Sequence, residues 1–525
     1  METTLKWSIA VLIVMLFIWL SVDELSQELP FTPEDQFSDD QAAHPRMSTS
    51  KIHQFNPHEP IIIEDDYGFD SQGFPGSGTI DDPYRIEGFN ITSSNGTSIV
   101  ISRTENYFCI RNNFLHGLSS AEFGIEFSGV EHGTIENNIV TNYSTSGITL
   151  RGSNNNVIIN NTITNNDGTG IYLQDSENNT ISNNTISNND STGIFLDSSV
   201  NNFISDNSVF NNDGGIYLWK IRGAYSLPGY NIIVNNFIAN NEWTGISIYD
   251  SASNTILDNI LMNNGFQVQG GLLRYFFQTE VRNNTINGRA LIYWQNIIEE
   301  TVPRGAGQII LVNCTAVTVT NQNLSDVETG LGVISSDKLS IFNNTIVNNC
   351  DHGIHLWDST ANSISRNTVS HNGIGIYLEN SYSSTISNNI FSHNGVGIYH
   401  QESENSVIFN NTFSNNHGYG ISILDRSSFC NVSWNIFIGN NPNGTSQAYD
   451  ASLNNTFNQN YWDDWVGDDP YPIDGVANNR DRHPQGAPNR DSASYWSENI
   501  LVGFFLFVVI LPVLGILIRR QKRNF

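Results

Sequence analysis

The sequence predicts an all-β fold built as a solenoid, with one coil for every 22–25 residues over most of the chain. The first observation is a repeat in which Gly-Ile-x-Leu is followed by a polar patch and then by x-Ile-x-Asn-Asn-x-Ile. The second is strand-like alternation, with apolar residues at every second position, as in Ile171/Leu173 and Ile376/Leu378. The third is the clustering of Asn, Asp, Gly and Ser between these runs, where tight turns are needed. One such coil cannot bury its own apolar side, so the coils must stack.

One asparagine recurs about fourteen positions after the glycine of each repeat. Stacked coils place equivalent residues about 4.8 Å apart, so an inward Asn amide can hydrogen-bond the next Asn along the axis. Such a ladder also satisfies buried turn backbone, and Asp is disfavoured there because stacked carboxylates repel each other. We therefore expect these asparagines to be structural rather than ligand-binding. The expected members are Asn138, Asn161, Asn184, Asn207, Asn236, Asn259, Asn344, Asn367, Asn389, Asn411 and Asn435.

Composition bounds the partners and the chemistry. The chain has 525 residues and a formal net charge of −29, whereas binding to nucleic acid needs a basic stripe. A chain of this length exceeds one globular core, but a solenoid has no such limit. The cysteines lie too far apart for a metal or redox motif and are expected to be buried as small apolar residues. They are Cys109, Cys314, Cys350 and Cys430.

Both ends of the chain carry apolar runs. Residues 1–20 contain Lys6 before an apolar run, as in a secretory signal peptide or signal anchor, without a clean cleavage site after it. Residues 499–518 are long enough to span a bilayer, and a basic tail at 519–525 follows directly. We expect a transmembrane helix there, with the tail cytoplasmic and the repeats outside the cell. The alternative for this run is a buried core helix, and an uncleaved N-terminal segment would add a second pass.

The composition also divides the middle of the chain. Asn-x-Ser/Thr sequons such as Asn90 and Asn142 suggest a glycoprotein, but most follow mechanically from the repeat. The aromatic insertion 219–231 and the blurred coils 265–313 interrupt the repeat and are candidates for a cleft wall. The expected segments are an acidic linker at 21–50, an N-terminal β cap at 51–98, coils at 99–460, a C-terminal cap at 461–483 and a stalk at 484–498.

These motifs together resemble a known group of proteins. The Asn-Asn-Thr-Ile and Gly-Ile-Tyr-Leu coils are similar to right-handed parallel β-helix proteins of the NosD-like, CASH-domain type in the pectate-lyase-like superfamily. Segments 76–86, 287–294 and 460–462 resemble archaeal surface members of that group. The resemblance covers about 51–480 and implies a right-handed single-stranded parallel β-helix. The superfamily includes lyases, hydrolases, epimerases, carbohydrate-binding modules and copper-site assembly factors, and the fold alone does not choose among them.

A column of acidic residues is expected on one edge of the coils. A solvated column that keeps the surface soluble is the favoured interpretation. Stacked carboxylates can also bind calcium, and the resemblance to calcium-dependent lyases makes Asp358, Glu379, Glu402 and Asp425 the candidate site. In such an enzyme Arg426 or Arg366 would serve as the base. Both arginines could equally form ordinary surface ion pairs with the acids. The whole column comprises Asp175, Asp197, Asp250, Asp358, Glu379, Glu402 and Asp425.

An aromatic column is expected on the outer face, two residues after each glycine. Sugar rings stack on such platforms, although neighbouring rings also stabilise each other by about 0.5–1.5 kcal/mol per pair. The candidates for carbohydrate binding are Tyr172, Phe195, Tyr217, Tyr377 and Tyr399, with His355 in the same column.

Two weaker constellations involve histidine. Asp351 and His352, with Asp326 one coil before, offer the acids of an inverting glycoside hydrolase, but the Asp-Asp and Arg-x-Lys signatures of that family are missing. His371 and His393 occupy equivalent places in consecutive coils, where two imidazoles can share copper. Exposed turn histidines are the alternative.

The sequence as a whole favours a membrane-anchored extracellular β-helix that binds a polysaccharide or glycoprotein, or has a structural, adhesive role at the cell surface. A calcium-dependent polysaccharide lyase or epimerase is the alternative, followed by a copper-site assembly factor. An enzyme is expected to bring acids and an arginine into one cleft with shifted pKa values, whereas a binding protein is expected to show uninterrupted columns.

Overall fold

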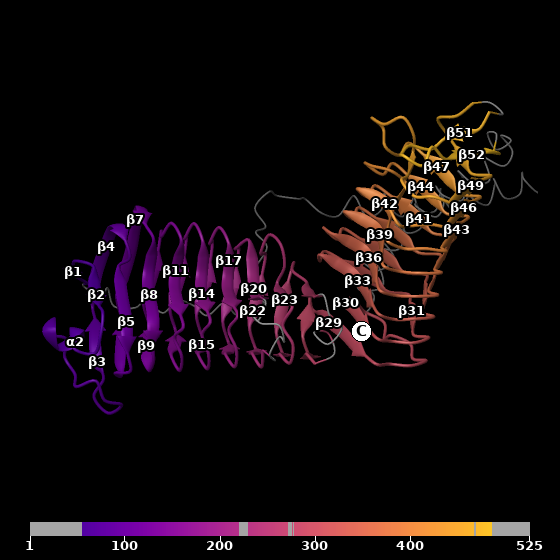
Figure 1. Cartoon of the computed structure of the whole chain (residues 1–525). Helices are drawn as coiled ribbons and strands as arrows, with labels where there is room; N and C mark the ends of the chain where they lie inside the picture. Colours follow the sequence, from indigo (N-terminus) through magenta and orange to yellow (C-terminus); the bar gives the residue numbers. More distant parts are fainter. Residues whose placement is uncertain (1–54, 220–228, 271–275, 277, 467–468, 486–525) are drawn as a thin grey trace, which may run out of the picture. The chain divides into compact units, whose positions relative to one another are not determined.

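The computed structural model describes residues 55–219, 229–270, 276, 278–466 and 469–485. They form short parallel strands joined by tight turns, three strands to a coil (Figure 1). The expected signal segment, linker, transmembrane helix, basic tail and most of the stalk lie outside these residues, as do 220–228 of the insertion. Within the described part of the chain, no helix is both long and apolar enough to span a bilayer.

The first stack of coils has three parallel sheets, which we number by their order in a coil. Sheet 1 contains β2 (Ile61–Ile63), β5 (Ile99–Thr104), β8 (Phe123–Val130), β11 (Ser146–Arg151), β14 (Thr169–Gln174), β17 (Thr192–Asp197), β20 (Gly214–Trp219), β23 (Ile246–Tyr249) and β26 (Phe266–Gln269). Sheet 2 contains β3 (Tyr84–Glu87), β6 (Phe108–Arg111), β9 (Gly133–Glu136), β12 (Val157–Ile159), β15 (Thr180–Ser182), β18 (Phe203–Ser205), β21 (Ile232–Val234), β24 (Thr255–Leu257) and β27 (Glu280–Arg282). Sheet 3 contains β1 (Asn56–His58), β4 (Phe89–Gly96), β7 (Phe114–Ala121), β10 (Ile139–Thr141), β13 (Thr162–Thr164), β16 (Thr185–Ser187), β19 (Ser208–Phe210), β22 (Phe237–Ala239), β25 (Ile260–Met262) and β28 (Thr285–Ile286).

The second stack repeats this arrangement. Its sheet 1 contains β30 (Ala306–Val312), β33 (Thr329–Ile334), β36 (His352–Trp357), β39 (Ile374–Glu379), β42 (Val396–Gln401), β45 (Ile421–Ile423) and β48 (Ala448–Asp450). Its sheet 2 contains β31 (Thr318–Thr320), β34 (Ser340–Phe342), β37 (Ser363–Ser365), β40 (Thr385–Ser387), β43 (Val407–Phe409), β46 (Asn431–Ser433), β49 (Thr456–Asn458) and β52 (Arg480–Asp481), with β51 (Tyr471–Pro472) antiparallel to β52. Its sheet 3 contains β32 (Asn323–Ser325), β35 (Thr345–Val347), β38 (Thr368–Ser370), β41 (Ile390–Ser392), β44 (Thr412–Ser414), β47 (Ile436–Ile438) and β50 (Tyr461–Trp462).

The Asn-Asn pair between sheets 2 and 3 explains both the turn and the stacking. Asn183 adopts a left-handed conformation (φ 54°), which Asn tolerates better than most residues. Asn184 points inward and is 1% exposed; its backbone N–H and its Nδ2 donate to Asn207 Oδ1 at 2.9 and 3.0 Å. The same Nδ2 also donates to Ile158 O of the preceding coil, at 2.9 Å. One side chain therefore bridges three coils.

All eleven asparagines expected in the ladder make this donation to the next coil. Further ladders, which the sequence analysis did not identify, occupy the other two corners. In the first stack they are Asn156, Asn179, Asn202, Asn231 and Asn254, and Asn166, Asn189, Asn212, Asn241 and Asn264. In the second stack they are Asn349, Asn372, Asn394, Asn416 and Asn440, and Ser336, Ser359, Ser381, Ser403 and Ser427.

The segment 51–98, expected as an N-terminal β cap, contains strands that pair in register with the next coil. Strands β1, β2 and β3 pair in parallel with β4, β5 and β6, so this segment continues all three sheets. What distinguishes it is the excursion between β2 and β3, which includes the short helix α2 (Gly68–Ser71). Phe69 of that helix is buried and stacks on Tyr84 at 4.7 Å. Gly76 is required in the same excursion because a Cβ there would lie 2.3 Å from Pro83 O.

The two stacks meet at the blurred coils and have separate cores. β28 pairs antiparallel with β29 (Arg289–Gln295), and β29 pairs in parallel with β30, so sheet 3 of the first stack continues into sheet 1 of the second. The outward residues Ile310, Val312 and Ile334 of the second stack belong to the core of the first. The expected run of coils at 99–460 is therefore interrupted here, because this outer face covers the end of the first stack.

The C-terminal cap closes the second stack with a buried carboxylate and a set of stacked aromatic rings. Asp481 is fully buried, and its Oδ2 accepts from Asn460 N and Nδ2 (2.8 and 2.9 Å) and from Trp462 Nε1 (3.2 Å). The ring of Trp462 stacks at 4.1 Å on Phe437 and at 4.0 Å on Tyr471. The ladder and the core thus both end on residues of β50 to β52.

Candidate functional site

The register separates the expected acidic column into two positions. Asp358 and Glu402 occupy a left-handed corner (φ 51° and 50°), whereas Glu379 ends β39 in register with Trp357 and Gln401. In the first stack Asp175 and Asp250 likewise lie at the corner, and Asp197 ends a strand.

The four acids proposed as a calcium site consequently have separate partners. Ser335 Oγ donates to Asp358 Oδ2 (2.9 Å), and His355 Nε2 lies 3.3 Å from Glu379 Oε2. Arg426, not Asp425, takes the left-handed corner of the next coil (φ 63°) and pairs with Glu402 at 3.2 Å. The described residues contain no group of three or more His, Cys, Asp and Glu arranged to hold a metal ion. The structure thus does not bring these acids into one cluster.

The remaining candidates, which are Arg366, Asp326 and the pair His371 and His393, lie at other corners of the coil than the acidic residues. Arg366 (φ 55°) sits between sheets 2 and 3, and its backbone N–H donates to Ser387 O. Asp326 (φ 61°) follows sheet 3, so it is Glu328, not Asp326, that lies beside Asp351: the Asp351 N–H donates to Glu328 O at 3.0 Å. His371 and His393 stack face to face, 5.0 Å apart. The copper hypothesis rests on this pair alone.

Of the four cysteines, Cys350 is exposed, contrary to expectation, because it lies in the turn that follows sheet 3.

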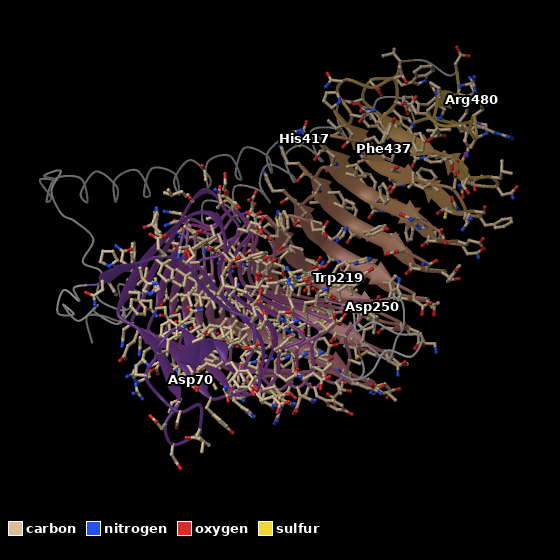
Figure 2. The ribbon with its side chains drawn as sticks, turned by 60° about the vertical axis from the view of Figure 1, so that its left-hand side comes forward. Asp70, Trp219, Asp250, His417, Phe437 and Arg480 are labelled. Carbon is tan, nitrogen blue, oxygen red and sulfur yellow. The ribbon has the colours of Figure 1, made fainter. Side chains whose placement is uncertain are left out.

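The aromatic column is present on the outer face of sheet 1 in both stacks. Ring centroids of Tyr172 and Phe195 lie 5.4 Å apart, and those of Phe195 and Tyr217 lie 5.5 Å apart. The row continues through Trp219, which stacks on Tyr249 at 4.4 Å, and ends near Asp250 (Figure 2).

In the second stack the row consists of His355, Tyr377 and Tyr399. His355 stacks on Tyr377 at 4.8 Å, and Tyr377 meets Tyr399 edge-on at 5.4 Å. The Tyr377 hydroxyl donates to Gln401 Oε1 at 2.9 Å. Rings that pack edge-on expose only part of their faces. The end of the row at His355, beside Trp357, is therefore the better platform for stacking a sugar ring.

That open end adjoins a cavity of about 420 Å³ between the two stacks. One wall is β26 of the first stack, and the other is the outer face of β30, β33, β36 and β39. The lining includes the rings of Tyr249, Phe266, Phe276 and Trp357, and the polar groups of Gln267, Gln269, Gln308, Thr329, His355 and Glu379. The sequence signals for this site were the blurred stretch 265–313 and, in the second stack, His355 of the aromatic column and Glu379 of the acidic column. No sequence signal marked Trp357 or Thr329.

Titratable groups with shifted pKa values lie next to this cavity. Burial, with a contribution from His355, lowers the pKa of His352 to about 3, although Asp351 Oδ2 is 3.2 Å from its Nδ1. The imidazole is therefore neutral, and its Nδ1–H can donate to that carboxylate. Burial raises the pKa of Asp351, and it raises the pKa of Glu328 to about 7. The structure thus brings the predicted Asp351 and His352 together with Glu328, His355 and Glu379, which the sequence did not join to them.

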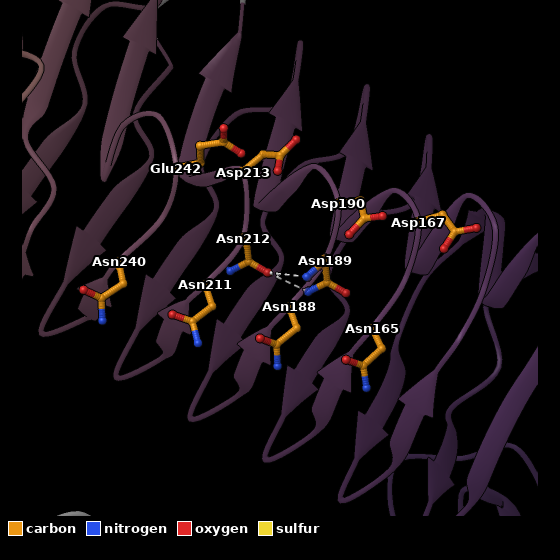
Figure 3. A pocket seen from close by; sticks show the side chains of 10 residues that line it. All are labelled: Asn165, Asp167, Asn188, Asn189, Asp190, Asn211, Asn212, Asp213, Asn240 and Glu242. Atoms are coloured by element: carbon orange, nitrogen blue, oxygen red, sulfur yellow. Dashed lines mark hydrogen bonds between the residues drawn. The ribbon is translucent and has the colours of Figure 1, made fainter. Parts of the chain in front are cut away.

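A second hollow, of about 590 Å³, lies on the first stack (Figure 3). Figure 3 shows a row of carboxylates, Asp167, Asp190, Asp213 and Glu242, above a row of amides that includes Asn165, Asn188, Asn211 and Asn240. Burial, Glu242 and Asp190 raise the pKa of Asp213. The lining of this second hollow contains no aromatic ring. The junction cavity, with rings and polar groups together, is therefore the better candidate for binding a small molecule or sugar.

Comparison with known proteins bears on the fold. The family described as right handed beta helix region matches residues 76–227 and 307–461, more than half of the chain. No curated protein sequence matches. Similar solved structures include the catalytic domain of an alpha-1,3-glucanase in complex with nigerose (14% identity, TM-score 0.32, 81% of this chain and 63% of that one). Others are the A-module of a mannuronan C-5 epimerase from Azotobacter vinelandii (11%, 0.24, 74% and 92%) and the Dettilon tailspike protein (11%, 0.28, 76% and 64%). The chain spans less than two thirds of the glucanase domain and of the tailspike, and at these identities the likeness concerns the fold alone.

Proposed function

Because the chain belongs to the right-handed β-helix family, we propose that it is a carbohydrate-binding protein of the cell surface whose binding site is the junction cavity. The observation that carries this proposal is the lining of the cavity. Aromatic rings from both stacks surround a small set of amide, hydroxyl, imidazole and carboxylate groups. Sugars present apolar ring faces and a rim of hydroxyls, so they match rings combined with planar polar side chains.

The aromatic row extends the proposed site for a polymer. His355 lines the cavity and also starts the row that runs through Tyr377 to Tyr399. Consecutive rings lie about one coil apart along the axis. A saccharide chain seated in the cavity would therefore continue along the outer face of sheet 1.

A glycan array probed with and without calcium tests the proposal. The variant Trp357→Ala removes a ring of the cavity and is expected to lower binding at least tenfold, while Trp434→Ala, an exposed ring at another corner, leaves it unchanged. Thermal melting of each variant separates lost binding from lost folding. Equal binding by both variants would place the glycan elsewhere.

Attachment to the membrane is a further part of the proposal and rests on the apolar run 499–518 and the basic residues after it. Removing residues 499–525 is expected to release the protein into the medium. Retention on the membrane after this deletion would indicate that the segment 1–20 is an uncleaved anchor.

A second candidate function is polysaccharide cleavage or epimerisation, because Glu328, Asp351 and His352 have shifted pKa values beside the cavity. Chain cleavage with a rise in ultraviolet absorbance would indicate a lyase, and new reducing ends without that rise would indicate a hydrolase. Either activity should fall in Glu379→Gln and would replace simple binding as the function.

A further inference from the structure

Glu328 lies in the seam between the two stacks, immediately before β33. It is 7% exposed, and neither carboxylate oxygen has a hydrogen-bond partner of regular geometry within the described structure. Across the seam, a Cβ added to Gly265 would lie 2.1 Å from Glu328 Oε2. The carboxyl group therefore packs against the bare Cα of a first-stack residue, and only glycine fits there.

None of the groups that shift the pKa of Glu328 carries a positive charge. On its own stack the neighbouring titratable groups are Asp351 and Cys350, and the charge of Asp351 disfavours ionisation of Glu328. On the first-stack side are Thr244 and Gly265, which carry no charge, and the Thr244 hydroxyl donates to Gly265 O at 3.4 Å. Burial raises the pKa of Glu328 to about 7 and outweighs the opposing contributions of its own backbone, of the Thr244 side chain and of the Gly265 backbone. An ionised carboxylate in this position would be buried without a counter-ion, which is costly.

The same seam holds both walls of the cavity. Gly265 directly precedes β26, and Phe266 N donates to Gln308 Oε1 at 2.9 Å. Gln308 Nε2 in turn donates to Phe266 O and Thr329 O, at 3.0 and 2.8 Å. Phe266, Gln308 and Thr329 all line the cavity, and Thr329 follows Glu328 in the chain. A change at the contact between Glu328 and Gly265 is therefore transmitted directly to β26 and to β33.

We propose that Glu328 is a proton-sensitive contact that regulates the cavity: the neutral carboxyl keeps β26 packed on the second stack, and ionisation loosens that packing. Acidic surroundings then favour the closed seam and tight binding, and alkaline surroundings favour release. The link to binding rests on the proposed function of the cavity, whereas the behaviour of the seam does not.

Hydrogen exchange tests the seam without any ligand. In the intact protein, protection of the amides of Phe266–Gln269, corrected for intrinsic exchange, is expected to fall at least fivefold between pH 6 and pH 8. In Glu328→Gln, which is neutral and has the same shape, protection should be equal at both values, and the exposed control Glu177→Gln should behave as the wild type. The same pH profile in Glu328→Gln and wild type would overturn the proposal.

Binding of array glycans at the two pH values tests the coupling. Cellohexaose, chitohexaose and a galacturonate hexamer serve as neutral, N-acetylated and anionic probes. A glycan whose binding is lost in Trp357→Ala is expected to bind the wild type at least fivefold more weakly at pH 8 than at pH 6. It is expected to bind Glu328→Gln equally at both pH values. If no glycan binds at either pH, the proposed function fails, while the exchange measurement still decides the behaviour of the seam. Binding that is independent of pH in the wild type would contradict the regulatory role.

Discussion

At the scale of single residues, each asparagine of the Asn-Asn pair has its own physical role. Asn183 provides a left-handed corner, and Asn184 provides the amide that joins three coils. The sequence predicted the second role because its spacing is regular. It did not reveal the ladders at the other two corners, although in the first stack these are also Asn at the same spacing, as Asn179 and Asn202 show. Only at one corner of the second stack does Ser take the place of Asn, where either side chain can accept the hydrogen bond.

Substitution of a ladder residue should lower stability. Asn184→Leu leaves the backbone N–H and the Nδ2 of Asn161 without their acceptor and the carbonyl of Ile158 without its donor. It is expected to lower the free energy of unfolding by about 1–3 kcal/mol. Chemical denaturation measures this, with Glu177→Gln on the exposed surface of the same region as control. An unchanged unfolding midpoint would contradict the structural role of the ladder.

His400 presents the opposite situation, a polar residue where the repeat calls for an apolar one. It points into the core in register with Leu378 and Ile423, and neither ring nitrogen has a hydrogen-bond partner of regular geometry. Burial lowers its pKa to about 4. In the unfolded chain His400 becomes protonated near pH 6.5, whereas in the folded chain it stays neutral down to about pH 4. The free energy of unfolding therefore decreases as the pH falls from about 6.5 to 4.

Replacing His400 should therefore stabilise the protein. His400→Leu matches Leu378 of the preceding coil and is expected to raise the free energy of unfolding by about 1–3 kcal/mol at neutral pH. It should also remove roughly 3 kcal/mol of the loss between pH 6.5 and 4, as a shift of this size implies. Denaturant titrations at both pH values, on wild type and variant, provide the measurement. Parallel pH profiles would show that the imidazole has partners in solution.

At the scale of elements, register decides which side chains meet. The acids at Asp358, Glu379 and Glu402 follow the glycine at similar distances, yet a strand end and a left-handed corner point in different directions. One extra residue before Arg426 then shifts Asp425 out of the series. A count along the sequence cannot separate neighbouring positions of this kind. The aromatic row was predictable because all its members lie inside strands, where the alternation is strict.

The terminal strand β52 should be essential for the second stack. Asp481→Ala removes the acceptor of Asn460 and Trp462 and is expected to cost more than about 2 kcal/mol, because several buried donors lose their partner. Asp481→Asn retains one acceptor oxygen, as in every other rung, and should cost clearly less. Thermal melting compares the two; equal losses would show that charge, not hydrogen bonding, is what Asp481 contributes.

At the scale of the whole molecule, the sequence predicted the stacked coils and their interruption at 265–313, but not that an outer face of the second stack is covered there. The covered outer face at Ile310 and Ile334 breaks the rule that such positions face solvent. Its residues find their partners in the end of the first stack, and a contact such as that of Glu328 with Gly265 leaves no periodic trace in the sequence. The cavity lies beside this contact, where the two stacks meet. In the sequence this junction appears mainly as a stretch where the repeat pattern fails.

Two cores should respond separately to damage. Ile181→Ala and Ile386→Ala each remove a fully buried side chain, one from each core, at a cost of about 2–5 kcal/mol. Hydrogen exchange is expected to show lost protection in the stack that carries the change and little effect in the other, as in repeat proteins with nearest-neighbour coupling. Uniform loss over both stacks would indicate a single cooperative unit.

In the second stack the ladder of amides has a direction, because each rung donates forward to the rung of the following coil. The peptide-like dipoles of the column are aligned, so partial positive charge gathers at the end where the last N–H groups emerge. That end is electrically equivalent to the N-terminus of an α-helix, and Asp481 occupies the place of an N-cap aspartate. The Asp481 side chain has no N–H group, so it cannot donate a hydrogen bond to a further rung of this column. The column of the second stack therefore ends at Asp481 with its donors neutralised.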